Sequence, residues 1–215
     1  MILDIVSVFQ LAAGVFWSAT YVLIIFKGFR DKTPGMPMIA MCANLCWEFI
    51  FSFIYPHGGL QGRLDMIWLA LDMVLLMQYV KYGRDEFSRS LPVEYFYPTL
   101  LLALALSFAI ISASVPELND PLGKYAAFAQ NLMMSILFIS MLRRRGSTRG
   151  QSVYIALFKM IGSLIPAVGF YLYLRSDLVT ALTAATLLFD LIYFWMIFKQ
   201  QRMEMRQPKS VTISG

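Results

Sequence analysis

The chain has 215 residues, of which 59% are hydrophobic and only 14% are charged, whereas soluble domains carry about 25% charged residues. With a mean hydropathy of +0.64, too few polar residues remain to cover a soluble globule, which argues against soluble α/β, β-sandwich and disordered classes. In so apolar a chain, the formal net charge of +5 indicates membrane topology rather than nucleic-acid binding. Cys42 and Cys46 lie within one apolar segment and imply no disulfide framework.

Seven apolar segments of about 20 residues follow one another, each long enough to cross about 30 Å of hydrocarbon. They predict an all-α bundle of seven transmembrane helices, at residues 3–26, 36–55, 64–82, 94–115, 121–142, 152–174 and 177–198. The first segment lacks a basic n-region and is longer than a signal peptide needs, so we expect a retained helix. We expect one seven-helix domain over residues 1–199 and a flexible polar cytosolic tail over residues 200–215.

Lys and Arg residues gather on one side of this predicted bundle. That side holds Lys27, Arg30, Lys32, Lys81, Arg84, Arg89, Arg143, Arg144, Arg145, Arg149, Lys199, Arg202, Arg206 and Lys209. The other side holds Arg63, Lys124 and Arg175, and Lys159 falls inside a helix. The positive-inside rule therefore places the N-terminus outside or in the lumen and the C-terminus in the cytosol.

Four ionisable residues, Glu48, Asp72, Lys159 and Asp190, fall deep inside predicted helices. Each costs at least about 2.5–3.5 kcal/mol near the bilayer centre, so each needs a structural or functional reason. Lys159 and Asp190 lie on consecutive helices at similar depth, and a structural ion pair is the alternative to a catalytic role. Asp72 has a structural alternative too, which is a hydrogen bond to a neighbouring helix.

Polar and aromatic residues fall on stripes of the second, third and seventh predicted helices. The stripes are Asn44, Glu48, Ser52 and Tyr55, then Trp68, Asp72 and Tyr79, then Thr183, Thr186, Asp190 and Tyr193. Lipid cannot satisfy such faces, so we expect these three helices to line one cavity, with Glu48 and Asp190 facing it from opposite sides. Gln130 and Asn131 add amides from the fifth helix, and Asn44 either orients Glu48 or joins two helices.

No cation lies at the level of Glu48, so we expect its carboxyl to stay neutral and to be able to donate a proton. Cys42, Cys46 and His57 do not make a convincing metal site, because His57 falls in an outer loop and Cys42 near mid-membrane. We therefore expect no metal and no cofactor.

Three classes of function compete for a seven-helix membrane protein, of which the first is a retinal protein or receptor. A retinal protein needs a Schiff-base lysine midway along the last helix, and residues 179–198 contain none, which excludes it. Nothing in the sequence supports a peptide or small-molecule receptor. A small proton-coupled transporter would use buried carboxylates, but Pro166 in the sixth helix has no counterpart in the second. The third class is an enzyme that uses neutral buried acids and aromatic walls on a lipophilic substrate.

Several separated motifs resemble the membrane-bound terpene cyclases of fungal meroterpenoid and indole-diterpene biosynthesis, which have bacterial drimentine-type relatives. The motifs are Asn44-Leu45-Cys46-Trp47-Glu48 with Tyr55-Pro56, Gln130-Asn131 with Ser135, Arg149-Gly150-Gln151-Ser152 with Lys159 and Gly162, and Asp190-Leu191-Ile192-Tyr193. Cys46 departs from the pattern, in which a small hydroxyl residue is more usual. The emopamil-binding sterol isomerases show a more distant resemblance.

The resemblance implies a seven-helix enzyme that starts cyclisation by protonation, without metal, with Glu48 and Asp190 as the catalytic acids. We expect Glu48 to be the proton donor, and Asp190, held ionised by Lys159, to be a base or a pocket organiser. Further candidates for substrate binding or cation stabilisation are Asn44, Trp47, Tyr55, Trp68, Asp72, Tyr79, Gln130, Asn131, Lys159 and Tyr193. The expected partners are a prenylated lipophilic substrate and membrane lipid, not nucleic acid. The expected location is the endoplasmic reticulum membrane in a fungus or the plasma membrane in a bacterium.

Overall fold

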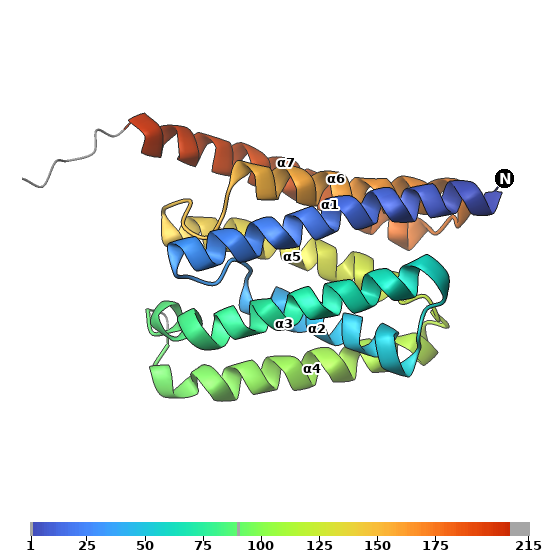
Figure 1. Ribbon diagram of the computed structural model, residues 1–215, viewed down its shortest axis with the longest axis horizontal. Coiled ribbons are helices and arrows are strands. Elements are labelled where there is room, and N and C mark those ends of the chain that lie inside the picture. The colour runs from blue at the N-terminus through green and yellow to red at the C-terminus, as the bar shows by residue number, and fades with distance from the viewer. Residues whose placement is uncertain (1, 90, 207–215) are drawn as a thin grey trace, which may run out of the picture.

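A computed structural model describes residues 2–89 and 91–206, and every regular element in them is a helix (Figure 1). The seven α-helices of this part are α1 (Ile2–Asp31), α2 (Met38–Phe49), α3 (Gly59–Phe87), α4 (Phe96–Glu117), α5 (Lys124–Arg145), α6 (Val153–Tyr173) and α7 (Asp177–Arg206). Two short helices complete it: the π-helix η1 (Ile50–Ile54), which continues α2, and the 3₁₀ helix η2 (Val93–Tyr95).

Each of the seven predicted segments coincides with one of these α-helices, so the all-helical prediction is confirmed. Five spans are long and apolar enough to cross a membrane: Ile5–Asp31, Val93–Glu117, Lys124–Arg145, Val153–Tyr173 and Asp177–Arg206. The apolar helix Met38–Ile54 is shorter. Residues 200–206, which we expected in a flexible tail, continue α7 as helix, and residues 207–215 lie outside the described residues.

The helices run up and down, so that consecutive connections lie at opposite ends of the bundle (Figure 1). Helices α2, α3 and α4 pack together, with α2 against both of the others. On the other side, α6 packs against α1 and α7, and α5 packs against α7. Contacts of α1 with α3 and of α2 with α5 join the two groups. The cavity described below lies between them.

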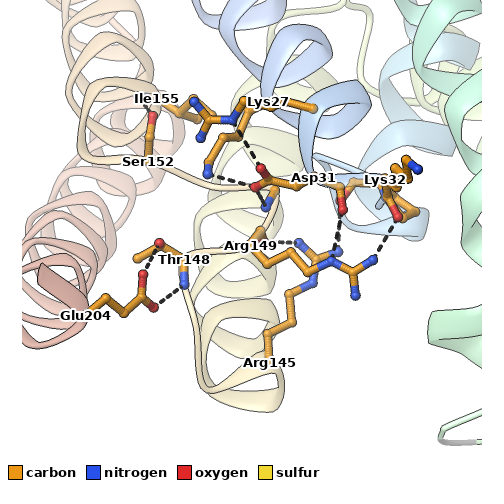
Figure 2. A network of polar contacts seen from close by, with 12 residues as sticks. Lys27, Asp31, Lys32, Arg145, Thr148, Arg149, Ser152, Ile155 and Glu204 are labelled. Atoms are coloured by element: carbon orange, nitrogen blue, oxygen red, sulfur yellow. Dashed lines mark hydrogen bonds and ion pairs between the residues drawn. The ribbon is translucent and has the colours of Figure 1, made fainter. Parts of the chain in front are cut away.

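Ion pairs and hydrogen bonds tie together the end of the bundle at which α1 ends and α6 begins (Figure 2). Asp31 accepts hydrogen bonds from the Lys27 ammonium and the Gly150 backbone N–H, both at 2.7 Å. Arg149 donates to the backbone carbonyls of Asp31 and Lys32 at 3.0 and 2.8 Å. These contacts bind the loop between α5 and α6 to the end of α1.

A second set of contacts at the same end extends to α3 and α7. Arg145 pairs with the Glu86 carboxylate and donates to the Pro34 carbonyl at 2.8 Å. The backbone N–H of Thr148 donates to Glu204 at 2.7 Å (Figure 2). Buried in the interior, the Tyr193 hydroxyl donates to Gln151 Oε1 at 2.9 Å. The loop between α5 and α6, which holds the motif Arg149-Gly150-Gln151-Ser152, therefore joins these helices to α1 and α7.

Candidate active site

A cavity of about 500 Å³ lies between α1, α2, α3, α5 and α6. Its volume falls within the range of about 300–1,000 Å³ that is typical of sites for drug-sized ligands. It reaches the end of the bundle that holds the starts of α3 and α5 and the end of α6. Aromatic side chains make much of its wall: Phe9, Trp17, Tyr21, Trp47, Trp68, Phe128, Phe170 and Tyr173.

Glu48 lines this cavity from α2 and is only 5% exposed. Its Oε2 is buried and has no hydrogen-bond partner in the described part of the chain, and no Lys or Arg there pairs with the carboxyl. A buried polar atom without a partner is rare in folded proteins and requires an explanation. A carboxyl group that donates its proton to a ligand would have no hydrogen-bond partner in the protein at that oxygen.

Tyr21 of α1 lines the cavity and links two polar residues of other helices. Its hydroxyl donates to Asp72 Oδ2 at 3.2 Å and accepts from Asn44 Nδ2 at 2.5 Å. Asp72 is fully buried behind Tyr21 and does not line the cavity. Of the two roles expected for Asn44, the bond to a neighbouring helix is the one that forms. Asp72 likewise has the structural role expected for it, because its hydrogen bond with Tyr21 joins α3 to α1.

Lys159 and Asp190 form the ion pair that their positions predicted, with Nζ and Oδ1 2.8 Å apart. The same ammonium donates to Asn131 Oδ1 at 3.0 Å and to Ser135 Oγ at 2.7 Å. Asn131 Nδ2 in turn donates to Ser163 Oγ at 2.8 Å. Asn131 and Ser163 both line the cavity, whereas Lys159 and Asp190 are buried behind them.

The expected arrangement, in which α2, α3 and α7 enclose one cavity, is wrong for α7. No α7 residue lines it, and α5 packs against both α2 and α7. Asp190 instead lines a separate small pocket of about 10 Å³, together with Asn131 and Ser163. The two carboxyls predicted to be catalytic therefore do not share a wall, and Asp190 is linked to the cavity through Lys159 and Asn131.

The remaining candidates divide between the cavity and the core. Trp47, Trp68 and Gln130 line the cavity with Asn44, Glu48 and Asn131. Tyr55, Tyr79 and Tyr193 do not: Tyr79 and Tyr193 are packed in the core, and Tyr55 is 39% exposed. The π-helix that begins at Ile50 explains why Tyr55 lies outside the cavity. Its i→i+5 hydrogen bonds turn the residues after Glu48 to a different face from the one that α-helical spacing predicts.

The aromatic wall next to Glu48 depends on the turn that precedes α5. Gly123 has a positive φ of 60°, and its carbonyl accepts a hydrogen bond from Trp47 Nε1 at 3.0 Å. A Cβ at Gly123 would collide with the Phe51 ring and with Trp47. On the other side of the cavity, Trp68 Nε1 donates to Ser18 Oγ of α1 at 3.2 Å. Both indoles are therefore fixed by neighbouring elements.

Our interpretation of the sequence missed the contribution of α1. Gln10, Trp17 and Tyr21 all line the cavity, together with Phe9 and Ala13. Their helical spacing was a usable signal, because Gln10, Trp17 and Tyr21 recur at steps of seven and four on one face. The interpretation of the sequence also missed His57, which lines the cavity and contacts the Asp65 carboxylate.

Comparison with known proteins supports the resemblance on which the site was predicted. The profile of the Pyr4-like transmembrane terpene cyclases matches residues 2–203. The chain is 28% identical to terpene cyclase pyr4 of Aspergillus fumigatus over 170 residues, which cover 77% of this chain and 69% of that protein. It is 31% identical to terpene cyclase penB of Penicillium crustosum over 169 residues, covering 74% and 67% of the two chains.

A third relative, the Pyr4-family terpene cyclase mfmH of Annulohypoxylon moriforme, is 27% identical over 157 residues, covering 72% of this chain and 65% of that protein. The chain thus spans about two thirds of the length of the relatives it matches. No solved structure is significantly similar to it. Since the family profile extends over nearly the whole transmembrane bundle, the chain belongs to the Pyr4-like transmembrane terpene cyclases.

Proposed function

We propose that this membrane cyclase protonates the terminal epoxide or alkene of a prenylated meroterpenoid or indole precursor and closes its rings through carbocations. One observation carries the proposal: the buried, unpartnered Glu48 carboxyl lies in the wall of an aromatic cavity of about 500 Å³. Such a site can hold a prenyl chain and present one proton to it.

Glu48 supplies the proton in this mechanism. Burial away from water and from any paired cation favours the neutral carboxyl, which is the form that can donate. Its O–H bond breaks as the proton passes to the epoxide oxygen or the terminal alkene carbon, leaving a carboxylate and a carbocation on the chain. Neighbouring double bonds then attack the cationic carbon in turn, and each attack closes a ring.

The aromatic walls stabilise the intermediates. The negative face of an aromatic ring attracts a cation, and Trp most strongly among the side chains. Trp17, Trp47 and Trp68 line the same cavity as Glu48, so a chain folded between them keeps its positive charge near a ring as it moves. Exclusion of water from this region would protect the cation from premature hydration.

Asp190 and Lys159 organise the wall rather than touch the substrate in this proposal. Their ion pair is fully buried, and Lys159 also donates a hydrogen bond to the side-chain oxygen Oδ1 of Asn131. Asn131 lines the cavity and is fixed from behind by this contact. Loss of the Asp190 charge would release Lys159 and with it the position of Asn131, so that an acid outside the cavity would still affect the reaction.

We place the N-terminus outside or in the lumen and the C-terminus in the cytosol. The ends of α1, α3, α5 and α7 carry the basic residues and lie at one end of the bundle (Figure 1). The positive-inside rule assigns that end to the cytosol. The cavity reaches the opposite end, and a prenylated substrate would enter it from the membrane of the endoplasmic reticulum or, in a bacterium, from the plasma membrane.

The test is conversion of a defined probe by membranes that contain the protein. The probe is a farnesylated phenolic acid with a terminal epoxide, and its alkene counterpart is assayed beside it. We expect a cyclised isomer of unchanged mass, formed without added metal or nucleotide and in the presence of a chelator. Activity that a chelator abolishes and magnesium restores would contradict the mechanism. Uptake of the unchanged probe into sealed vesicles would instead favour a transporter.

A further inference from the structure

His57 and Asp65 form a hydrogen-bonded dyad at the mouth of the cavity. His57 lies in the short connection between η1 and α3, and its Nδ1 is 2.7 Å from Asp65 Oδ2. Gln61 Nε2 donates to Asp65 Oδ1, also at 2.7 Å. Asp65 is completely buried, and each of its two oxygens has one of these two partners.

This arrangement determines what the other ring nitrogen can do. A carboxylate that accepts Nδ1–H leaves Nε2 of the neutral imidazole with a free lone pair. Nε2 is buried and has no hydrogen-bond partner in the described part of the chain, although His57 lines the cavity. An oriented acceptor without a partner, in a cavity wall, indicates that the partner is a ligand.

The imidazole is also held rigidly. Its ring stacks on Phe51 with centroids 4.8 Å apart and an interplanar angle of 6°, and Trp47 lies 5.8 Å away. The side chain is only 9% exposed. Packing of this kind fixes the direction of Nε2, and a general base must be oriented toward the proton that it removes.

His57 and Glu48 line the same cavity from different segments, His57 from the connection after η1 and Glu48 from α2. Protonation places the positive charge at one end of the prenyl chain, and every ring closure moves it further along. The base that ends the reaction must therefore line the same cavity as the donor and be a different group from it.

We propose that His57, positioned by Asp65, is the base that removes the final proton from the cyclised carbocation; this inference rests on the proposed function. The C–H bond next to the cationic carbon breaks, its electron pair becomes the new C=C bond, and the proton passes to His57 Nε2. Asp65 stabilises the resulting imidazolium. The proton then leaves to water at the mouth and Glu48 recovers one from water, so the net reaction is an isomerisation.

His57→Gln and Asp65→Asn test this assignment with the farnesylated epoxide as probe. A general base contributes about 10²–10⁴-fold to the step in which it acts, which here is the final deprotonation. Loss of His57 should therefore leave protonation by Glu48 intact and let the carbocation react by other routes. We expect continued consumption of the probe, with the normal product replaced by other alkene isomers and by a hydrated product. Asp65→Asn should shift the products in the same direction but less far.

Arg63→Gln is the matched control, because Arg63 is exposed in the first turns of α3 and does not line the cavity. It should leave both rate and products unchanged. Unaltered products from His57→Gln would overturn the proposal, and so would weaker probe binding with products of the same kind. If His57→Gln does not fold, His57→Asn replaces it in the same assay. A wild type that does not convert the probe would refute the proposed function itself.

Discussion

The ammonium of Lys159 lies 2.8 Å from Oδ1 of Asp190, and this pair is buried behind one side of the cavity. The two other donors of Lys159 reach Asn131 and Ser135 of α5. Because Asn131 lines the cavity, the charge on α7 acts on the site through α6 and α5. We therefore propose that Asp190 is a positioning residue, whose loss would affect structure and binding before chemistry.

Lys159→Met should destabilise the protein severely, because it leaves the Asp190 carboxylate buried without its cation. Breaking a buried pair by removing one partner costs about 3–5 kcal/mol. Combining Lys159→Met with Asp190→Leu should recover part of this loss, because no charge then remains buried. Thermal unfolding in detergent measures both, and additive losses in the double variant would refute the coupling.

Glu48→Gln should abolish turnover while leaving folding and binding intact, since the amide keeps the shape of the side chain but has no acidic proton. A general acid contributes about 10²–10⁴-fold, and without it no cation forms. Turnover of the epoxide and binding of an ether analogue that cannot open are measured separately. Glu94→Gln is the control, because Glu94 is exposed in η2.

The same two measurements on Asp190→Asn decide between the two acids. We expect weaker binding or lower stability together with lost activity. If Asp190→Asn bound the analogue normally and did no chemistry while Glu48→Gln still turned over, the two roles would have to be exchanged.

Tyr21→Phe separates the ring of Tyr21 from its hydroxyl. The variant keeps an aromatic face in the cavity wall but leaves Asp72 Oδ2 without its donor, and an unsatisfied buried group costs about 1–3 kcal/mol. We expect lower stability with an unchanged set of products, whereas Tyr21→Leu should also yield prematurely quenched products. Unfolding temperature and product analysis distinguish these effects. Altered products from Tyr21→Phe would mean that the hydroxyl takes part in the reaction.

The sequence predicted helices and polar faces well because both follow from local spacing and from the cost of polar groups in lipid. That cost shows that Asp190 avoids lipid, but it does not reveal which interior space the carboxyl meets. Asn131 of α5 and Ser163 of α6 border both the cavity and the small pocket of Asp190. The face of α2 was predicted correctly through Glu48 and incorrectly at Tyr55, beyond the start of η1. His57 was missed because its partner Asp65 lies across the junction of a loop and a helix.

Gly123→Ala should disturb the wall beside Glu48 more than its backbone strain alone explains. Gly123 and Gly146 border the two ends of α5 with nearly the same positive φ, 60° and 59°. A non-glycine residue in this conformation costs about 1–2 kcal/mol. At Gly146 nothing lies within 4 Å of an added Cβ, whereas at Gly123 it would meet the Phe51 and Trp47 rings.

The two alanine variants therefore share the backbone strain and differ in the collision. Both should lower the unfolding temperature, but only Gly123→Ala should also change the products, because Trp47 and Phe51 must move and Phe51 supports the His57 ring. Unfolding in detergent and product analysis of the farnesylated epoxide are compared for the pair. Equal losses of stability with identical products would show that the wall tolerates the added methyl group and that the position of Trp47 does not direct the cyclisation.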